Sequence, residues 1–163
     1  MTKKLDLAPL LRFMETLPKS GDVELTLLKC HLLVEEELTN IIYKSHKNPK
    51  YIKDARLSFS QKTKLARASN DISHSAWVWK GLELLNKTRN ELAHNLTSHE
   101  IENKLEAFIS HMKKSGPEWP KEAISGKFTN FHWAAFVAYN IISSAASFDP
   151  ASVKPVTLLS KNA

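Results

Sequence analysis

The sequence has little of what several common architectures require. Only 4 of its 163 residues are glycine and 7 are proline, too few for the many tight turns of a β-sandwich or barrel. The single cysteine, Cys30, excludes an internal disulfide and a zinc site built from cysteines. No window approaches the roughly 18 consecutive apolar residues of a membrane span, and Lys3-Lys4 leads into a mixed amphipathic segment rather than a signal-peptide core. These absences predict an all-α, cytoplasmic protein without a membrane partner.

What is present fits one helical domain with a basic surface. Apolar residues make up 42% and charged residues 25%, and the formal net charge is +6. This charge favours a polyanionic partner, although the cations are spread along the chain and many basic domains bind no nucleic acid. We expect a single domain over residues 1–148 and a flexible C-terminal tail over residues 149–163, which contains Pro150 and Pro155.

Apolar residues recur at helical spacing in several separate segments. The spacing and the capping residues predict an up-and-down bundle of about five to six helices, over residues 5–17, 22–46, 59–69, 73 or 75 to 96, 97–116 and 131–148. Residues 47–57, which include Asn48-Pro49, are expected to form a connection. Asp22, Ser58 and either Ser73 or Ser75 are the predicted N-caps, and Thr97 with Glu100 fits a capping box.

The first two helices each have an apolar face that is expected to pack into the core. In the first helix the residues expected to pack are Leu7, Leu10, Leu11, Met14 and Leu17. In the second helix they are Leu25, Leu28, Leu32, Leu38, Ile41 and Ile42. The paired Trp77 and Trp79 of the central helix point to different sides, so they are interpreted as core or interface rather than as a base-stacking platform.

The end of the central helix combines an apolar stripe with polar groups. The stripe residues, at steps of four and three, are Val78, Leu82, Leu85, Leu92 and Leu96. Arg89 occupies the missing step of that stripe, where it must reach solvent or meet an anion. Asn86, Asn90 and His94 form a second stripe. Arg89 and His94 lie about 140° apart on an ideal helix, so a symmetric partner would help them meet at one ligand.

The six residues from Arg89 to His94 resemble the R-x4-6-H motif of HEPN domains, including the polar Asn90 directly after the arginine. The resemblance implies a small helical protein that cleaves RNA as a homodimer, without a metal or other cofactor, in a toxin–antitoxin or defence system. Arg89, Asn90 and His94 would be catalytic, and an antitoxin protein could be a partner. Residues 27–43 and 55–68 are also similar to the mannitol-operon-repressor-like branch, which is described as regulatory.

Further residues are assigned supporting roles. His31 and Glu35, four residues apart, are expected beside Arg89 if the two long helices pack antiparallel, and Asn86 joins them. The residues predicted to bind RNA phosphates are Lys62, Lys64, Arg67 and Lys87. Two alternatives stay open: the lysines form a solvated flank, and Arg89 pairs with a buried glutamate to hold two helices in register.

The resemblance to these two branches therefore implies two alternative functions. In the first, the protein is a metal-independent endoribonuclease in which His94 transfers a proton and Arg89 neutralises the phosphate. No glycine-rich phosphate loop, H-E-x-x-H or G-x-S-x-G motif competes, and the seven histidines show no metal-site spacing. In the second, the protein is a non-catalytic dimeric regulatory or interaction module, and the Arg–His pair is structural or binds an anion.

Overall fold

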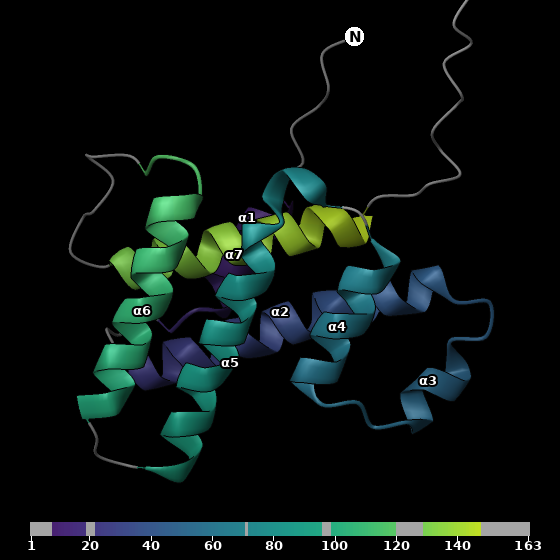
Figure 1. The fold of residues 1–163 in the computed structure, drawn as a ribbon, viewed down its shortest axis with the longest axis horizontal. Helices are drawn as coiled ribbons and strands as arrows, with labels where there is room; N and C mark the ends of the chain where they lie inside the picture. Colours follow the sequence, from purple (N-terminus) through teal and green to yellow (C-terminus); the bar gives the residue numbers. More distant parts are fainter. Residues whose placement is uncertain (1–7, 19–21, 71, 96–98, 120–128, 148–163) are drawn as a thin grey trace, which may run out of the picture.

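The computed structural model describes residues 8–18, 22–70, 72–95, 99–119 and 129–147, and these contain helices but no strand. The all-α prediction is confirmed. Seven α-helices and one 3-10 turn, Ser73–Ser75, lie in the described part of the chain (Figure 1). The helices are α1 (Ala8–Thr16), α2 (Val23–Ser45), α3 (Lys50–Asp54), α4 (Phe59–Ser69), α5 (Trp77–His94), α6 (His99–Ser115) and α7 (Asn130–Ser147).

Among the described helices, two pairs pack against each other most extensively. The helix α2 packs along α7, and α5 packs along α6, while α4 covers the junction of α2 and α5 (Figure 1). At Gly81 a Cβ atom would lie only 2.5 Å from Met112 Sδ, so the glycine permits the close approach of α5 and α6. The largest fully buried side chains include Phe13, Leu38, Leu82, Phe108 and Tyr139, contributed by five different helices.

Two of the predicted N-caps are confirmed and one is wrong. Asp22 accepts a hydrogen bond from the Leu25 amide at 2.9 Å, and Ser58 forms a reciprocal capping box with Gln61. Neither Ser73 nor Ser75 caps α5, because both lie in the 3-10 turn that precedes it, and Ala76 stands at the N-cap without a side-chain bond. Thr97, Leu96 and the predicted tail at 149–163 lie outside the described residues.

The predicted connection at 47–57 contains a short helix, α3, which accounts for a helix count above the expected five to six. Pro49 stands at its N-terminus, a position that proline tolerates. Arg56, two residues after the end of α3, has a φ of 47°, a left-handed conformation that stops the helix.

The predicted apolar faces of α1 and α2 are partly wrong. In α1 the fully buried residue is Phe13, which packs against Phe136 and Tyr139 of α7, whereas Leu11 and Met14 are 58% and 50% exposed. In α2 the buried side is formed by Leu27, Cys30, Leu33, Val34, Leu38, Ile41 and Ile42. The stripe with Leu25, Leu28 and Leu32 faces solvent instead. Both sides of α2 are apolar, so only the position of α7 decides which side is covered.

Five of these residues, together with Val23, are exposed on α1 and α2, and we call the set the α1–α2 apolar surface: Leu11, Met14, Val23, Leu25, Leu28 and Leu32. Among the described residues, one further large apolar side chain is exposed, that of Tyr51 on α3. A concentration of exposed apolar side chains on two adjacent helices is typical of a surface that another molecule covers.

The predictions for α5 and α7 agree with the structure. Val78, Leu82 and Leu85 are fully buried and Leu92 nearly so, and Trp79 is buried in the core beside the half-buried Trp77. The helix α7 is buried on most of its sides, as its continuous apolar composition predicted. Within the described residues, no helix has both the length and the apolar character needed to cross a bilayer.

Candidate functional site

Arg89 lies at the edge of the core, at the end of the α5 stripe. Its side chain is half-buried, and Nη1 donates a 3.4 Å hydrogen bond to Oδ1 of the neighbouring Asn90. No ion pair joins it to any acidic residue in the described part of the chain. The alternative in which Arg89 pairs with a buried glutamate is therefore absent from the described structure, and its planar fork of donors remains available.

His94 is the last residue of α5 and is exposed to solvent. Its ring makes no hydrogen bond or ion pair with another described residue. The helix ends here because Asn95 adopts an extended conformation, although its amide still donates to the Glu91 carbonyl at 2.9 Å.

Glu91, between the two motif residues, serves the fold. It accepts hydrogen bonds from Lys104 of α6 and from the Asn95 side chain, and the bond from Lys104 is the main reason why the pKa of Glu91 is below its usual value. Lys104 also lies 3.5 Å from Glu100. These contacts tie the end of α5 to α6, so Glu91 is occupied and does not compete with His94 as a proton acceptor.

A second polar group, which we call the His31 cluster, lies one turn earlier on α5. It consists of His31 and Glu35 of α2, Lys62 of α4 and Asn86 of α5. His31 is buried, its ring stacks on Phe59 with 4.1 Å between centroids, and Nε2 lies 3.1 Å from Asn86 Oδ1. Because Asn86 Oδ1 is an acceptor, His31 Nε2 carries the proton and donates. Burial is the main cause that lowers the pKa of His31, so the ring is neutral at pH 7.

The structure groups the predicted supporting residues around His31 and pairs Glu35 with Lys62. His31 and Asn86 meet as expected, and the charge of Arg89 is close enough to contribute to the lowered pKa of His31. Glu35, however, is bound by Lys62 at 2.8 Å and lies 3.9 Å from His31 Nδ1, rather than pairing with Arg89. The His31 cluster therefore holds α2, α4 and α5 together.

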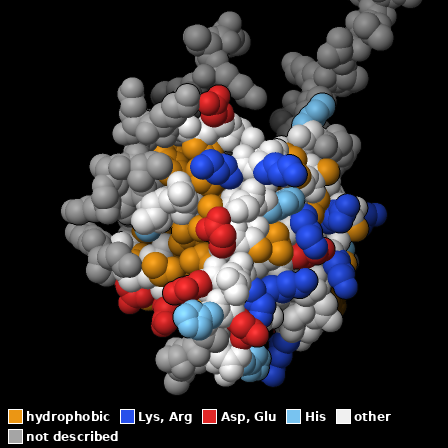
Figure 2. Space-filling model, turned by 60° about the vertical axis from the view of Figure 1, so that its left-hand side comes forward, with side chains coloured by type: hydrophobic (Ala, Val, Ile, Leu, Met, Phe, Trp, Pro, Cys, Tyr) orange, Lys and Arg blue, Asp and Glu red, His pale blue; other side chains and the backbone are white. Residues whose placement is uncertain are grey.

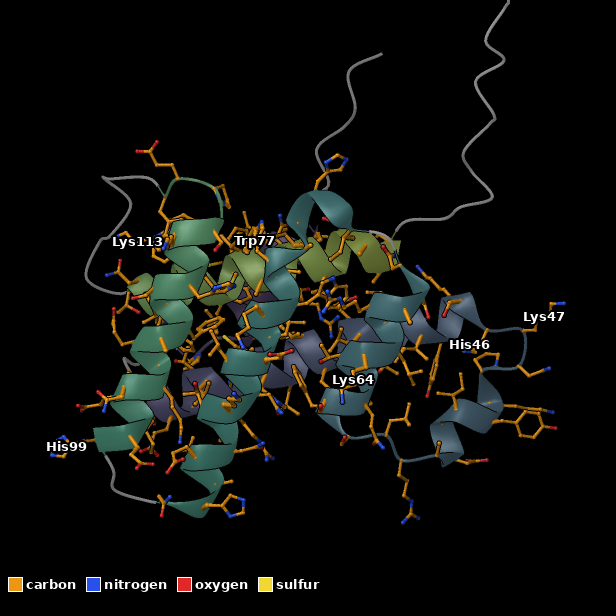
Figure 3. All side chains as sticks on the ribbon, viewed as in Figure 1. His46, Lys47, Lys64, Trp77, His99 and Lys113 are labelled. Atoms are coloured by element: carbon orange, nitrogen blue, oxygen red, sulfur yellow. The ribbon has the colours of Figure 1, made fainter. Side chains whose placement is uncertain are left out.

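The four predicted phosphate-binding residues differ in their exposure and in their partners. Lys62 is held by Glu35, and Arg67 is exposed in the last turn of α4. Lys64 and Lys87 face each other across a groove between α4 and α5 with a volume of about 290 Å³. Figure 3 shows Lys64 on the front of α4, on the side of the molecule where α5 also lies.

The sequence did not identify the groove itself, and of its other lining residues only Asn86 had been assigned a site role: Phe59, Ser60, Thr63, Leu82, Glu83 and Asn86. Ser60 and Thr63 are three residues apart and so share a face of α4. That spacing was visible in the sequence, but nothing in the sequence said that this face looks toward α5.

Within one chain, Arg89 and His94 do not converge. Arg89 lies toward the buried edge of α5 near His31, whereas His94 lies on the outer side, in agreement with the angular separation of about 140°. No cluster of three or more metal-ligating side chains occurs within the described ranges.

Comparisons of the chain with protein-family models, with curated proteins and with solved structures found no match.

Proposed function

We propose that the protein is a metal-independent endoribonuclease of the HEPN type, which acts in the cytoplasm as a homodimer with Arg89, Asn90 and His94 as its catalytic residues. The observation that carries this proposal is that the fold makes little use of the motif. Arg89 contacts only its neighbour Asn90 through its hydrogen bonds, and His94 has no partner among the described residues. Residues kept for packing or for holding helices in register are normally buried and paired, as in the His31 cluster.

The proposed reaction needs no group other than the RNA itself and these side chains. The 2′-oxygen of a ribose attacks the adjacent phosphorus, the bond from phosphorus to the 5′-oxygen breaks, and a cyclic phosphate and a 5′-hydroxyl result. One His94 takes the proton of the attacking hydroxyl, and the His94 of the second copy protonates the departing oxygen. Arg89 binds two phosphate oxygens with its planar fork, and Asn90 orients Arg89 by their shared hydrogen bond.

The α1–α2 apolar surface supports the homodimer. Leu28 and Leu32 lie three residues before and one residue after His31, which touches α5. A second copy that covers these leucines would lie beside the edge of α5 that carries Arg89. Residues of two chains would then complete one site, which the separation of Arg89 and His94 within one chain requires.

The same apolar surface favours a second candidate, a dimeric regulatory or interaction module without catalysis. In that case the leucines provide the function and the Arg–His pair binds an anion or is inert. The RNA-cleavage assay below separates the two candidates, because a regulatory module leaves RNA intact.

The test is cleavage of total RNA by the purified protein in EDTA, beside two single histidine variants. Loss of a general acid–base group typically lowers the rate by about 10²–10⁴-fold, so His94→Ala should fall in that range. His99→Ala is the matched control, because His99 is a fully exposed histidine at the start of the next helix (Figure 3). Both variants should melt at the same temperature as the unchanged protein, since neither side chain is buried.

The proposal fails if the unchanged protein leaves RNA intact, or if His94→Ala and His99→Ala cut it equally well. Cleavage that disappears in EDTA would require a metal and would also contradict it.

A further inference from the structure

The groove between α4 and α5 has two free cations on opposite walls. Lys64 of α4 and Lys87 of α5 are exposed, and neither forms an ion pair with another described residue. The adjacent Lys62 differs, because Glu35 binds it. Figure 2 shows that Lys and Arg side chains gather on one side of the visible face, while Asp and Glu are more frequent on the other. Two unpaired ammonium groups across a groove are suited to a phosphate between them.

The polar atoms between the two lysines suit a nucleotide rather than a bare anion. The Asn86 Oδ1 atom is occupied by His31, so the amide nitrogen of Asn86 is left to donate to a ligand. The Thr63 hydroxyl donates to the Phe59 carbonyl at 2.9 Å and keeps its lone pairs as acceptors. Phe59 and Leu82 lie beneath the groove and are buried, so the contacts to a ligand come from the polar and charged residues of its walls. Phosphate and hydroxyl groups thus each have a suitable neighbour.

One carboxylate, Glu83, also lines the groove. It is paired with Lys80 at 3.1 Å, so its charge is partly neutralised. It still opposes a phosphate close by, which places the phosphate at the Lys64 and Lys87 part of the groove.

Two of the proposed catalytic residues lie on the same side of α5 as Lys87 of the groove. Glu83, Lys87, Asn90 and His94 follow one another at steps of four, three and four residues and are all exposed, so they lie along one side of α5. Lys87 and His94 are separated by about 10 Å along the helix axis. A strand held at Lys87 therefore runs along α5 toward His94.

We propose that the α4–α5 groove binds one nucleotide of single-stranded RNA, with its phosphate between Lys64 and Lys87, next to the nucleotide that is cut. This inference rests on the proposed function for the identity of the ligand as RNA. A single strand is proposed because a groove of about 290 Å³ between two helices has room for one nucleotide and not for the paired strands of a duplex.

The test is binding of a fluorescein-labelled single-stranded oligoribonucleotide, followed by anisotropy in a His94→Ala background that keeps the RNA intact. The double variant Lys64→Ala/Lys87→Ala should weaken binding by about tenfold to a hundredfold. The slope of log K against log salt should become shallower by about 0.7, since the two lysines share one phosphate and each phosphate contact on a single strand contributes about 0.7. The charge-matched control is Lys47→Ala/Lys114→Ala, two exposed lysines outside the groove, of which Lys47 lies in the distant α2–α3 connection (Figure 3).

Equal binding by the two double variants would overturn the inference, and so would binding of duplex RNA as tight as that of the single strand. Adenosine monophosphate and inorganic phosphate serve as competitors. If these competitors displace the RNA only at millimolar concentration, the groove is a site for a strand. If adenosine monophosphate binds as tightly as the oligoribonucleotide, the groove is a site for a free nucleotide. If the wild-type protein binds RNA through the groove but does not cleave it, only the proposed function is wrong. If the double variant Lys64→Ala/Lys87→Ala cleaves RNA at the wild-type rate, only the groove proposal is wrong.

Discussion

Two groups of polar side chains include residues of α5 that are one turn apart. The fold buries and pairs the first group, whereas it leaves the second largely unpaired. Asn86 belongs to the His31 cluster, where a buried ring, an amide, a carboxylate and an ammonium group are all paired. Arg89, Asn90 and His94 follow directly, but they are half-buried or exposed, and the single bond among them joins two neighbours. Polar groups that the fold buries must be satisfied by the fold, whereas groups left at the surface are available to a ligand.

The position of each group along α5 explains the difference. The middle of α5 packs between α2 and α4, while its C-terminal end extends past α4 beside α6 (Figure 1). The end of the helix therefore has neighbours on fewer sides. Among the described residues at this end, Glu91 faces α6 and accepts a hydrogen bond from Lys104.

The strongest way to sharpen this comparison is Arg89→Lys. Lysine keeps the positive charge but loses the planar fork that binds two phosphate oxygens, so the rate of RNA cleavage should fall by about 10²–10³-fold. The melting temperature should change little, because Arg89 has no ion pair to lose within the described residues. Cleavage kinetics and calorimetry on the same sample check both parts. A protein that unfolds, or one that cuts RNA normally, would make Arg89 structural or irrelevant.

His31→Ala should show the reverse behaviour. It removes a buried ring that stacks on Phe59 and leaves Asn86 Oδ1 without its donor, so the free energy of unfolding should fall by about 2–3 kcal/mol. Urea denaturation measures this loss. Below the unfolding transition the variant should retain most of its cleavage activity. If His31→Ala instead abolished cleavage at unchanged stability, the division between the two groups would be wrong.

The dimer can be broken without touching either group. Leu28→Asp together with Leu32→Asp places two charges on the α1–α2 apolar surface, and the dissociation constant of the dimer should rise by about 30-fold or more. Sedimentation at micromolar concentration gives the oligomeric state, and cleavage should decline with the fraction of dimer. Tyr51→Asp is the control, because Tyr51 is at least as exposed as either leucine but lies on α3, outside the surface.

A monomeric wild-type protein at that concentration would contradict the shared site. A dimer that persists in the Leu28→Asp/Leu32→Asp variant would place the interface elsewhere. In the second case the α1–α2 apolar surface would be assigned to another partner, such as an antitoxin protein.

The smallest expected effect is a dependence of stability on pH. Burial lowers the pKa of His31 and of His132 below the ordinary value of 6.5. When the pH falls below 6.5, the unfolded chain binds protons that the folded chain does not, so the free energy of unfolding decreases. The urea midpoint should therefore drop between about pH 7.5 and about pH 5.5. His31→Leu should reduce this drop, because the substitution removes one of the two buried histidines.

The sequence alone was sufficient for the helical class and most helix boundaries. Strong local signals lie behind these successes: the capping box at Ser58, the cap at Asp22 and the apolar stripe through Leu82 and Leu85. Each depends on residues within one or two helical turns, so no knowledge of the rest of the fold was needed. The polar interruption of the α5 stripe, which suggested the candidate site, is a local signal of the same kind.

Other features were decided only by the tertiary structure. Both sides of α2 carry leucines, and α7 covers the side with Leu27 while Leu32 is left in solvent. Glu35 was expected to lie beside Arg89, and in the structure its carboxylate forms an ion pair with Lys62 of α4. Lys64 and Lys87, 23 positions apart in the chain, line one groove because α4 folds back against α5. Spacing along a chain specifies which residues share a face of a helix, whereas the partner of that face depends on how distant helices pack.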